Sequence, residues 1–438
     1  MAEAGYKPKV LIVGAGLGGL TLAQVFRKNG VPFEIFERDE HEVSVNYPAS
    51  AVVYRNLRPP FPIPSVLDEL FKAFPEDMPN FRDTVHHLNP LDLETQVVFY
   101  FHNDRLGAEC SPSTPTLRCN RLLLRKWLST NINVQYGRVA NKIERVGDKM
   151  VVTFQNGTTA TGDLVVGADG ANSIVREHVL GKPNKEVLRN VPISSITGET
   201  TLSGEAFVRQ LEIAHSMAII PVTTGDGWNN LYMGLTKIAP DGQSGEFFWV
   251  LSWHDPLAQQ TGRIAVNTLP REERLVIAKK MTAHLDPKFR RIIDETTTEG
   301  IRDIGWVPTD CHLDELPLGR ATLLGDAVHL MMPYKAEGGI HAMRDALHLG
   351  KLLTELESPD DAALHRALTA FYAEMLPRGA QAVELSRYFQ HNFRKDKTGV
   401  RVWGHPVKSL PDEKLEIGPE GVRSVAKGIC KLNLVPSF

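Results

Sequence analysis

The first 40 residues combine short apolar runs with one amphipathic stretch. Val10–Val13 are four consecutive apolar residues, a pattern typical of a parallel strand buried on both faces. A glycine-rich turn follows, and apolar residues at three- and four-residue spacing then predict a helix that ends near Gly30. Pro32 and the run Phe33–Phe36 begin a second strand. The pattern therefore predicts a strand–turn–helix–strand unit at the start of the chain.

Two later apolar runs also end in small and acidic residues. Leu164–Val166 leads into Gly167-Ala168-Asp169-Gly170, and Arg320–Leu324 leads into Gly325-Asp326. Continuous apolar runs are typical of strands covered on both faces, so we expect both to be buried strands. Further helices are predicted over Ser65–Phe74, Arg121–Trp127, Gly339–Leu356 and Ala362–Tyr388, and further strands over Gln96–His102 and Val151–Phe154.

The pattern changes between about residues 192 and 311. Short segments there are rich in β-branched and aromatic residues and are separated by glycine turns, which indicates antiparallel strands. The predicted strands are Phe207–Ile213, Ser216–Val222, Asn230–Lys237 and Glu246–Trp253. We therefore predict an α/β fold in which a Rossmann-like domain carries an inserted, mainly antiparallel β-sheet domain and ends in C-terminal helices.

The domain boundaries follow from these changes in pattern. We assign residues 1–83, 105–190 and 312–391 to the discontinuous Rossmann-like domain. Residues 84–104 and 191–311 form the inserted sheet domain, and 392–438 form an extension with weak periodicity.

Composition excludes several functional classes. The 438 residues include 49 Lys and Arg against 52 Asp and Glu, a formal charge of −3, which gives no electrostatic reason to expect nucleic acid or an anionic membrane as partner. With 42% hydrophobic and 23% charged residues, the chain is not largely disordered.

Cysteine usage and hydropathy bear on location. The 4 cysteines form no CxxC pair, so we expect neither a disulfide framework nor a metal site, and a reducing compartment. No apolar run reaches the ~18 residues of a membrane span, and the N-terminal residues lack a signal-peptide core. We expect a cytoplasmic protein.

The first glycine-rich turn has the spacing Gly14-x-Gly16-x-x-Gly19. A dinucleotide pyrophosphate requires close backbone amides and the positive end of a helix, which this strand–turn–helix context supplies. Glu37 ends the second strand, where a carboxylate accepts ribose hydroxyls and disfavours a 2′-phosphate, which favours FAD or NAD. A tight turn in an ordinary α/β sheet is the alternative. The candidate dinucleotide-binding residues are Gly14, Gly16, Leu17, Gly18, Gly19, Glu37 and Arg38.

The other two motifs are less specific. Asp169 is equally consistent with a ligand-binding turn and with a structural Asp-Gly turn in which Ser173 caps a helix. Asp326 follows a buried strand and is suited to binding a hydroxyl of a polyol. The amides of Gly338 and Gly339, at a helix start, are suited to a phosphate or a reduced, anionic ring.

These three motifs, in this order, resemble the single-component FAD-dependent aromatic hydroxylases of salicylate- and para-hydroxybenzoate-hydroxylase type. The resemblance covers roughly residues 9–388, and residues 333–338 are most similar to the branch common in fungal secondary metabolism. It implies that Gly14, Gly16 and Gly19 bind the FAD pyrophosphate and that Glu37 binds the adenosine ribose. It also implies that Arg121 binds the phosphate and ribityl region, and that Asp169 contributes to binding both FAD and the nicotinamide cofactor. The ribityl chain would be bound by Gly325 and Asp326, and the isoalloxazine by Pro333, Gly338 and Gly339. A solvated helix charge is the alternative for Arg121.

The resemblance also implies an activity. NADPH or NADH binds transiently and reduces FAD, and O2 then gives a flavin hydroperoxide. This hydroxylates or epoxidises an aromatic or polyketide/terpenoid-like secondary metabolite. Ala336, Ile340 and the segment 45–50 depart from the family pattern. Ile340 and the segment 45–50 motivate a second hypothesis, a redox-neutral cyclase or isomerase on the same FAD-binding scaffold. An FAD-stabilised binding module is a third.

Substrate-binding residues are expected in the inserted sheet. Arg209 and Tyr232 are the candidates for binding a phenolate or enolate, and a sheet-edge or surface role is the alternative for each. The alternating aromatic and apolar residues of one predicted strand suit either a pocket floor or plain core, and core is favoured: Phe247, Trp249, Leu251 and Trp253. The sequence leaves open whether the protein forms a homodimer.

Overall fold

The computed structural model describes residues 6–42, 50–54, 72–79, 116–213, 217–222, 229–239, 242–303, 308–333, 337–391, 394–395 and 401–402. Several predicted features lie outside these residues. They are the strand Gln96–His102, residues 65–71 of the predicted helix, the segment 84–104, residues 45–49, Ala336 and most of the extension 392–438.

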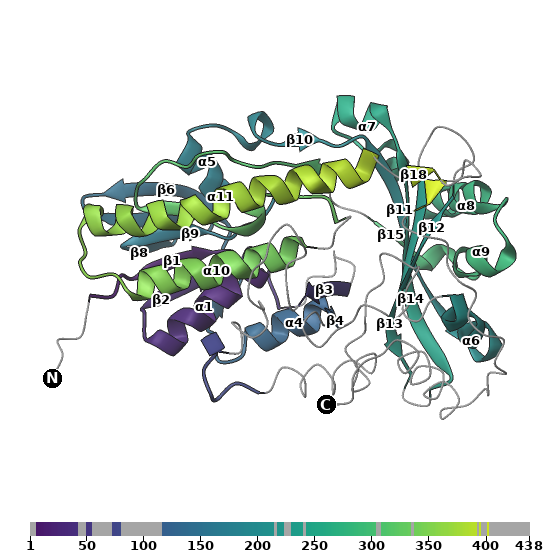
Figure 1. The fold of residues 1–438 in the computed structure, drawn as a ribbon, viewed down its shortest axis with the longest axis horizontal. Coiled ribbons are helices and arrows are strands. Elements are labelled where there is room, and N and C mark those ends of the chain that lie inside the picture. The colour runs from purple at the N-terminus through teal and green to yellow at the C-terminus, as the bar shows by residue number, and fades with distance from the viewer. Residues whose placement is uncertain are drawn as a thin grey trace.

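A five-stranded parallel sheet forms the centre of the molecule's larger part (Figure 1). Its strand order is β17-β9-β1-β2-β5. The strands are β1 (Val10–Val13), β2 (Phe33–Phe36), β5 (Val134–Gln135), β9 (Leu164–Gly167) and β17 (Ala321–Leu323). Every residue of β1, β9 and β17 is buried, as expected for strands that are covered on both faces. The four apolar runs therefore join one sheet, which confirms the predicted α/β fold.

Helices cover this sheet. Helix α1 (Leu17–Asn29) packs against α10 (Gly338–Thr354), and α11 (Asp361–His391) runs beside α10 (Figure 1). The others are α4 (Arg121–Leu128) and α5 (Ile174–Leu180). Two small antiparallel sheets complete this part: β6 (Ala140–Val146), β7 (Lys149–Phe154) and β8 (Thr159–Gly162), and β3 (Ser50–Tyr54) with β4 (Thr116–Asn120). Among the described residues, no helix is both long and apolar enough to cross a membrane.

A second five-stranded sheet lies beside the first part. Its order is β12-β13-β14-β11-β15 and all its pairs are antiparallel. The strands are β11 (Ile193–Ser203), β12 (Met217–Pro221), β13 (Asn229–Ile238), β14 (Ser244–His254) and β15 (Ile301–Arg302). Helices α6 (Gly204–Ile213), α8 (Arg271–Thr282) and α9 (Pro287–Asp294) lie on one side of this sheet, and the parallel-sheet part lies on the other (Figure 1).

The prediction of a strand over Phe207–Ile213 is wrong, because this segment is helix α6. Phe207 is fully buried and contacts the ring of Phe247, and Gln210 hydrogen-bonds to the sulfur of Met233 at 2.9 Å. Residues 207 and 210 thus share the face that packs on the sheet, which is helical spacing. A short apolar run does not distinguish helix from strand by itself, and packing on the sheet decides.

The inserted part also contains helices that the sequence pattern did not predict. Helices α7 (Pro256–Thr261) and α9 each begin with an aspartate cap followed by proline. Asp255 accepts hydrogen bonds from the amides of Leu257 and Ala258, and Asp286 accepts one from Lys288. Asp-Pro at a helix start is a recognisable signal, since proline suits the first helical position.

The aromatic stripe of β14 is core, as favoured from the sequence. Trp249 and Leu251 are fully buried, and Phe247 nearly so, against the helix-covered face. Trp249 lies over Gly198, where a Cβ would come within 2.4 Å of the indole ring. Its indole N–H donates to the Thr296 hydroxyl at 2.8 Å, which satisfies the polar atom of a buried ring.

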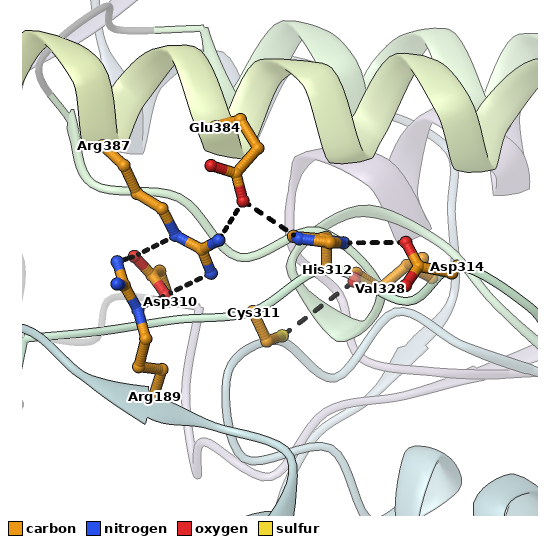
Figure 2. A network of polar contacts seen from close by, with 8 residues as sticks. All are labelled: Arg189, Asp310, Cys311, His312, Asp314, Val328, Glu384 and Arg387. Atoms are coloured by element: carbon orange, nitrogen blue, oxygen red, sulfur yellow. Dashed lines mark hydrogen bonds and ion pairs between the residues drawn. The ribbon is translucent and has the colours of Figure 1, made fainter.

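The two segments that lead to and from the antiparallel sheet pair with each other. These are β10 (Arg189–Asn190) and β16 (Thr309–Asp310). Asp310 is 1% exposed and lies between the guanidinium groups of Arg189 and Arg387, each of which donates two hydrogen bonds to its carboxylate (Figure 2). Because Arg387 belongs to α11, one carboxylate ties both connecting segments to the C-terminal helix.

Candidate functional site

The predicted cofactor motifs all follow strands of the parallel sheet. Gly14, Glu37, Ala168 and Leu324 come directly after β1, β2, β9 and β17. Parallel strands end at the same edge of a sheet, so the structure brings the motifs together there. From β1 the chain continues to β2 on one side of the sheet and later returns to β9 on the other side, so β1 marks a switch point in the strand order. Ligands of open α/β sheets bind at such switch points.

The glycines of the first motif do different work. Gly14 has φ 106°, and a Cβ there would lie 2.3 Å from the Ala168 carbonyl oxygen. A Cβ on Gly19 would lie 2.0 Å from the Gly14 oxygen, and one on Gly18 2.6 Å from the Leu324 side chain. Gly16, in contrast, would present its Cβ to open space. Three glycines therefore permit close packing, while Gly16 leaves room in front of the helix start.

Glu37 is buried beside this turn. Its Oε2 accepts a hydrogen bond from the Ala15 amide at 2.8 Å. Arg125, which the sequence pattern did not single out, donates from Nε to the Ala15 carbonyl at 2.9 Å, and its NH2 lies 3.3 Å from Glu37 Oε2. Arg125 stands one helical turn after Arg121, the spacing that would have identified it as a neighbour of the same site. Arg38, next to Glu37, is exposed.

Asp169 acts as a helix cap in the structure. Its carboxylate accepts hydrogen bonds from the Ser173 hydroxyl at 2.6 Å and the Ile174 amide at 2.8 Å, while Ser173 caps α5 by accepting from Arg176. The structural reading of this motif, with Ser173 as cap, is therefore confirmed. A role of Asp169 towards a cofactor stays a prediction. The buried Arg176 connects this motif to the next, since it donates to the Ala327 carbonyl at 3.1 Å.

The third motif places Asp326 opposite the start of α10. A Cβ on Gly338 would lie 3.8 Å from Asp326 Oδ1, and one on Gly339 would lie 3.0 Å from Leu17 at the start of α1. The Asp326 side chain is exposed, yet desolvation by the surrounding protein raises its pKa, against the opposing charges of His329 and Arg121. The structure thus brings Arg121 into the electrostatic neighbourhood of Asp326. Pro333 is exposed beyond this turn.

Arg209 and Tyr232 are not brought together. Arg209 is on α6, where it forms an exposed ion pair with Glu205. Tyr232 is on β13, and its neighbour Met233 faces α6, so Tyr232 points to the opposite face of the sheet, towards the parallel-sheet part. Its ring packs on Phe248 with centroids 5.3 Å apart.

These residues fit FAD. The amides at the start of α1 have no side-chain cap among the described residues, and the open space at Gly16 admits a pyrophosphate. The carboxylate of Glu37 at the end of β2 is suited to accept ribose hydroxyls, and the accessible Asp326 carboxylate beside Gly338 is suited to accept a hydroxyl of a polyol chain.

Comparison with known proteins agrees with this geometry. The family model described as "FAD binding domain" matches residues 121–386. The FAD-dependent monooxygenase thnD of Trichoderma harzianum is 39% identical over 385 residues, covering 86% of this chain and 92% of that protein. The FAD-dependent monooxygenase dbaB of Emericella nidulans is 27% identical over 354 residues, covering 78% and 86%.

Solved structures share the fold at lower identity. Klebsiella pneumoniae HpxO complexed with FAD and uric acid has a TM-score of 0.62 and 19% identity, covering 97% of this chain and 96% of that one. The 2,6-dihydroxypyridine-3-hydroxylase from Arthrobacter nicotinovorans has a TM-score of 0.60 and 18% identity, covering 94% and 100%. By the family match and the relative at 39% identity, the chain belongs to the FAD-dependent monooxygenases and is an FAD-binding oxidoreductase.

Proposed function

We propose that this enzyme uses NADPH or NADH and O2 to hydroxylate or epoxidise an aromatic or polyketide/terpenoid-like small molecule. The observation that carries the proposal is the meeting of Gly16, Glu37 and Asp326 at one edge of the parallel sheet, beside the start of α10. Bound there, FAD would supply the redox chemistry by which O2 is activated.

The chain's own residues would hold and orient the cofactor. The first amides of α1 meet the pyrophosphate, and Glu37, fixed by the Ala15 amide and by Arg125, meets the ribose. Asp326 and Arg121 would bind the ribityl and phosphate groups of FAD. The amides of Gly338 and Gly339 would bind its isoalloxazine ring. Asp169 caps α5 beside this edge and thereby shapes the turn that follows β9.

The antiparallel sheet is the proposed substrate domain, within the boundaries 84–104 and 191–311. The support is its asymmetry: helices and core side chains cover the face of Trp249, while Tyr232 and Phe248 lie on the face turned towards the parallel-sheet part. Tyr232 is the proposed contact for a phenolate or enolate substrate. Arg209 is not part of the proposed substrate site, because its helix α6 packs on the other face of the antiparallel sheet.

The test begins with the visible spectrum of the purified protein and continues with NADPH and NADH oxidation against a panel of phenols and polyketides. We expect bound FAD, substrate-stimulated oxidation of the reductant and a product that contains one atom from ¹⁸O2. Product formation under anaerobic conditions, without bleaching of the flavin, would refute the monooxygenase proposal and support the redox-neutral cyclase or isomerase.

Tyr232→Phe tests the substrate face, with Tyr372→Phe as the matched control. Tyr372 is buried and its hydroxyl pairs with Thr322 at 3.0 Å, so the control removes a tyrosine hydroxyl away from the antiparallel sheet. We expect Tyr232→Phe to raise KM with unchanged FAD content and Tyr372→Phe to leave KM unchanged. Equal KM values in both variants would remove Tyr232 from the proposed site. Gel filtration tests whether the protein forms a homodimer.

A further inference from the structure

Behind the turn that carries Asp326 lies a buried carboxylate from helix α10. Asp345 is fully buried and accepts three hydrogen bonds. Its Oδ2 accepts from the Gly325 amide at 2.8 Å and contacts His329 Nε2 at 2.7 Å, and its Oδ1 accepts from Arg378 at 2.6 Å. One side chain therefore joins the turn after β17, the residue that ends this turn, and helix α11.

The turn depends on this carboxylate for its first hydrogen bond. The Leu324 amide still belongs to the sheet, since it donates to the Gly167 carbonyl at 2.9 Å. At Gly325 the chain leaves the sheet with φ 62°, and the amide donates to Asp345. The next residue is Asp326. Asp345 thus fixes the direction of the chain at Asp326, because it holds the amide of the preceding residue, Gly325.

Asp345 is itself held from the other side. Arg378 is 5% exposed and also donates to Glu374 at 2.8 Å and contacts His341 Nδ1 at 2.7 Å. Burial alone would raise the pKa of Asp345, but the charges of His329 and Arg378 outweigh it and hold this pKa well below its usual value. The carboxylate is therefore ionised at neutral pH, with both oxygens committed to hydrogen bonds.

Helix α11 also approaches the turn closely. A Cβ on Gly379 would come within 2.6 Å of the His329 ring, so no side chain separates α11 from the residue after the turn. The position of Arg378 is consequently fixed relative to the turn by backbone packing, and Asp345 has little freedom to move away from Gly325.

We propose that Asp345 is a positioning residue for FAD: anchored by Arg378, it fixes the Gly325–Asp326 turn so that the Asp326 carboxylate faces the ribityl chain. The inference rests on the assignment of Asp326 to FAD in the proposed function. The competing role is purely structural, in which Asp345 joins α10 to α11 without affecting the cofactor.

The experiment compares Asp345→Asn with Asp163→Asn. Asp163 is also buried in the parallel-sheet part and accepts a backbone amide, that of Lys9, at 2.8 Å, but it precedes β9 and so lies at the opposite edge of the sheet. The readouts are the FAD dissociation constant of the apoprotein, from quenching of flavin fluorescence, and the Tm with and without FAD. We expect both variants to lower the Tm of the apoprotein.

Only Asp345→Asn should change cofactor binding. Asparagine keeps one acceptor oxygen, but its side-chain NH2 cannot accept a hydrogen bond. At least one of the three donors therefore loses its partner, and the turn loosens. We expect the FAD dissociation constant to rise at least tenfold and the Tm gain on adding FAD to shrink accordingly. Asp163→Asn should stay within twofold of the unmodified protein.

A third variant separates the two ways of failing. If Asp326→Asn binds FAD like the unmodified protein, the assignment of Asp326 is wrong. If Asp326→Asn weakens binding while Asp345→Asn matches Asp163→Asn, only the positioning role is wrong.

A further pair applies if Asp345→Asn does not fold. Arg378→Lys keeps the charge but loses the guanidinium NH2 that donates to Asp345, and it should weaken FAD binding about threefold or more. Its control is Arg274→Lys, in which an equally buried arginine of α8 loses its bond to the Arg302 carbonyl. Equal FAD affinities of these two variants would overturn the inference.

Discussion

Replacing Asp310 by asparagine tests whether the link between the two parts of the molecule depends on one carboxylate. The change keeps the shape of the side chain and removes its charge. In the unmodified protein, Arg189 and Arg387 donate four hydrogen bonds of 2.7–3.0 Å to a carboxylate that is 1% exposed (Figure 2). The asparagine retains one acceptor oxygen, so at least two of these bonds are lost or weakened.

The size of the effect follows from the exposure of the partners. Removing one member of a fully buried ion pair costs about 3–5 kcal/mol, because the other charge is left unpaired. Here the Arg189 side chain is 43% exposed and the Arg387 side chain 18%, so water replaces part of what Arg189 loses. After this discount we expect the free energy of unfolding to fall by about 2–3 kcal/mol at pH 7.

The effect also has a pH dependence with a definite sign. Burial alone would raise the pKa of Asp310, but the hydrogen bonds from Arg189 and Arg387 outweigh it and lower this pKa below its usual value. A carboxylate with a lowered folded-state pKa stabilises the protein above its unfolded pKa of about 3.9, and this stabilisation is lost as the pH falls through the folded-state pKa. The difference between the two proteins is therefore largest near pH 7 and shrinks below about pH 4.

The assay is urea unfolding followed by tryptophan fluorescence at pH 7 and at pH 3.5, in saturating FAD. The matched control is Glu205→Gln, which neutralises the exposed ion pair with Arg209 and should change stability by less than about 0.5 kcal/mol. A value for Asp310→Asn as small as that of the control at pH 7 would refute the reasoning. So would a loss that stays constant as the pH falls.

Two further predictions concern glycines that contact different neighbours. Gly16→Ala should leave the Tm of the apoprotein unchanged, since its Cβ would contact nothing within 4 Å, and should weaken FAD binding at least tenfold by filling the space of the pyrophosphate. Gly19→Ala should instead lower the Tm of the apoprotein, because its Cβ would lie 2.0 Å from the Gly14 oxygen. A thermal shift assay in which Gly16→Ala lowers the apoprotein Tm more than Gly19→Ala does would contradict this prediction. Gly198→Ala should cost about 1–3 kcal/mol in urea unfolding by forcing the Trp249 ring out of its place, and unchanged stability with unchanged tryptophan fluorescence would show that the ring has room to move.

Much of the cofactor edge is predictable because its signals are local. An apolar run, a turn of defined glycine spacing and an amphipathic helix are each encoded within a few residues, and parallel strands necessarily end at one edge. The sequence therefore predicts the strands and the turns that follow them, and the structure shows that Gly14, Glu37, Asp169 and Asp326 lie at one edge of the sheet.

The inserted part is less predictable. The strands over 217–221, 229–238 and 244–254 agree with the sequence pattern, but Phe207–Ile213 is a helix and the pattern does not predict α8. Short apolar runs support either structure, and the sheet against which Phe207 packs comes from residues far away in the sequence.

The sequence alone determined the strand–turn–helix–strand unit and the order of the motifs, because each depends on backbone geometry within one segment. Only the tertiary structure decided which arginine side chains pair with the buried carboxylates. Arg125 reaches Glu37, Arg378 reaches Asp345, and Arg387 reaches Asp310 across separate elements. A buried charge is stable only with a partner, and the chain brings these partners together only when the sheet and its helices pack.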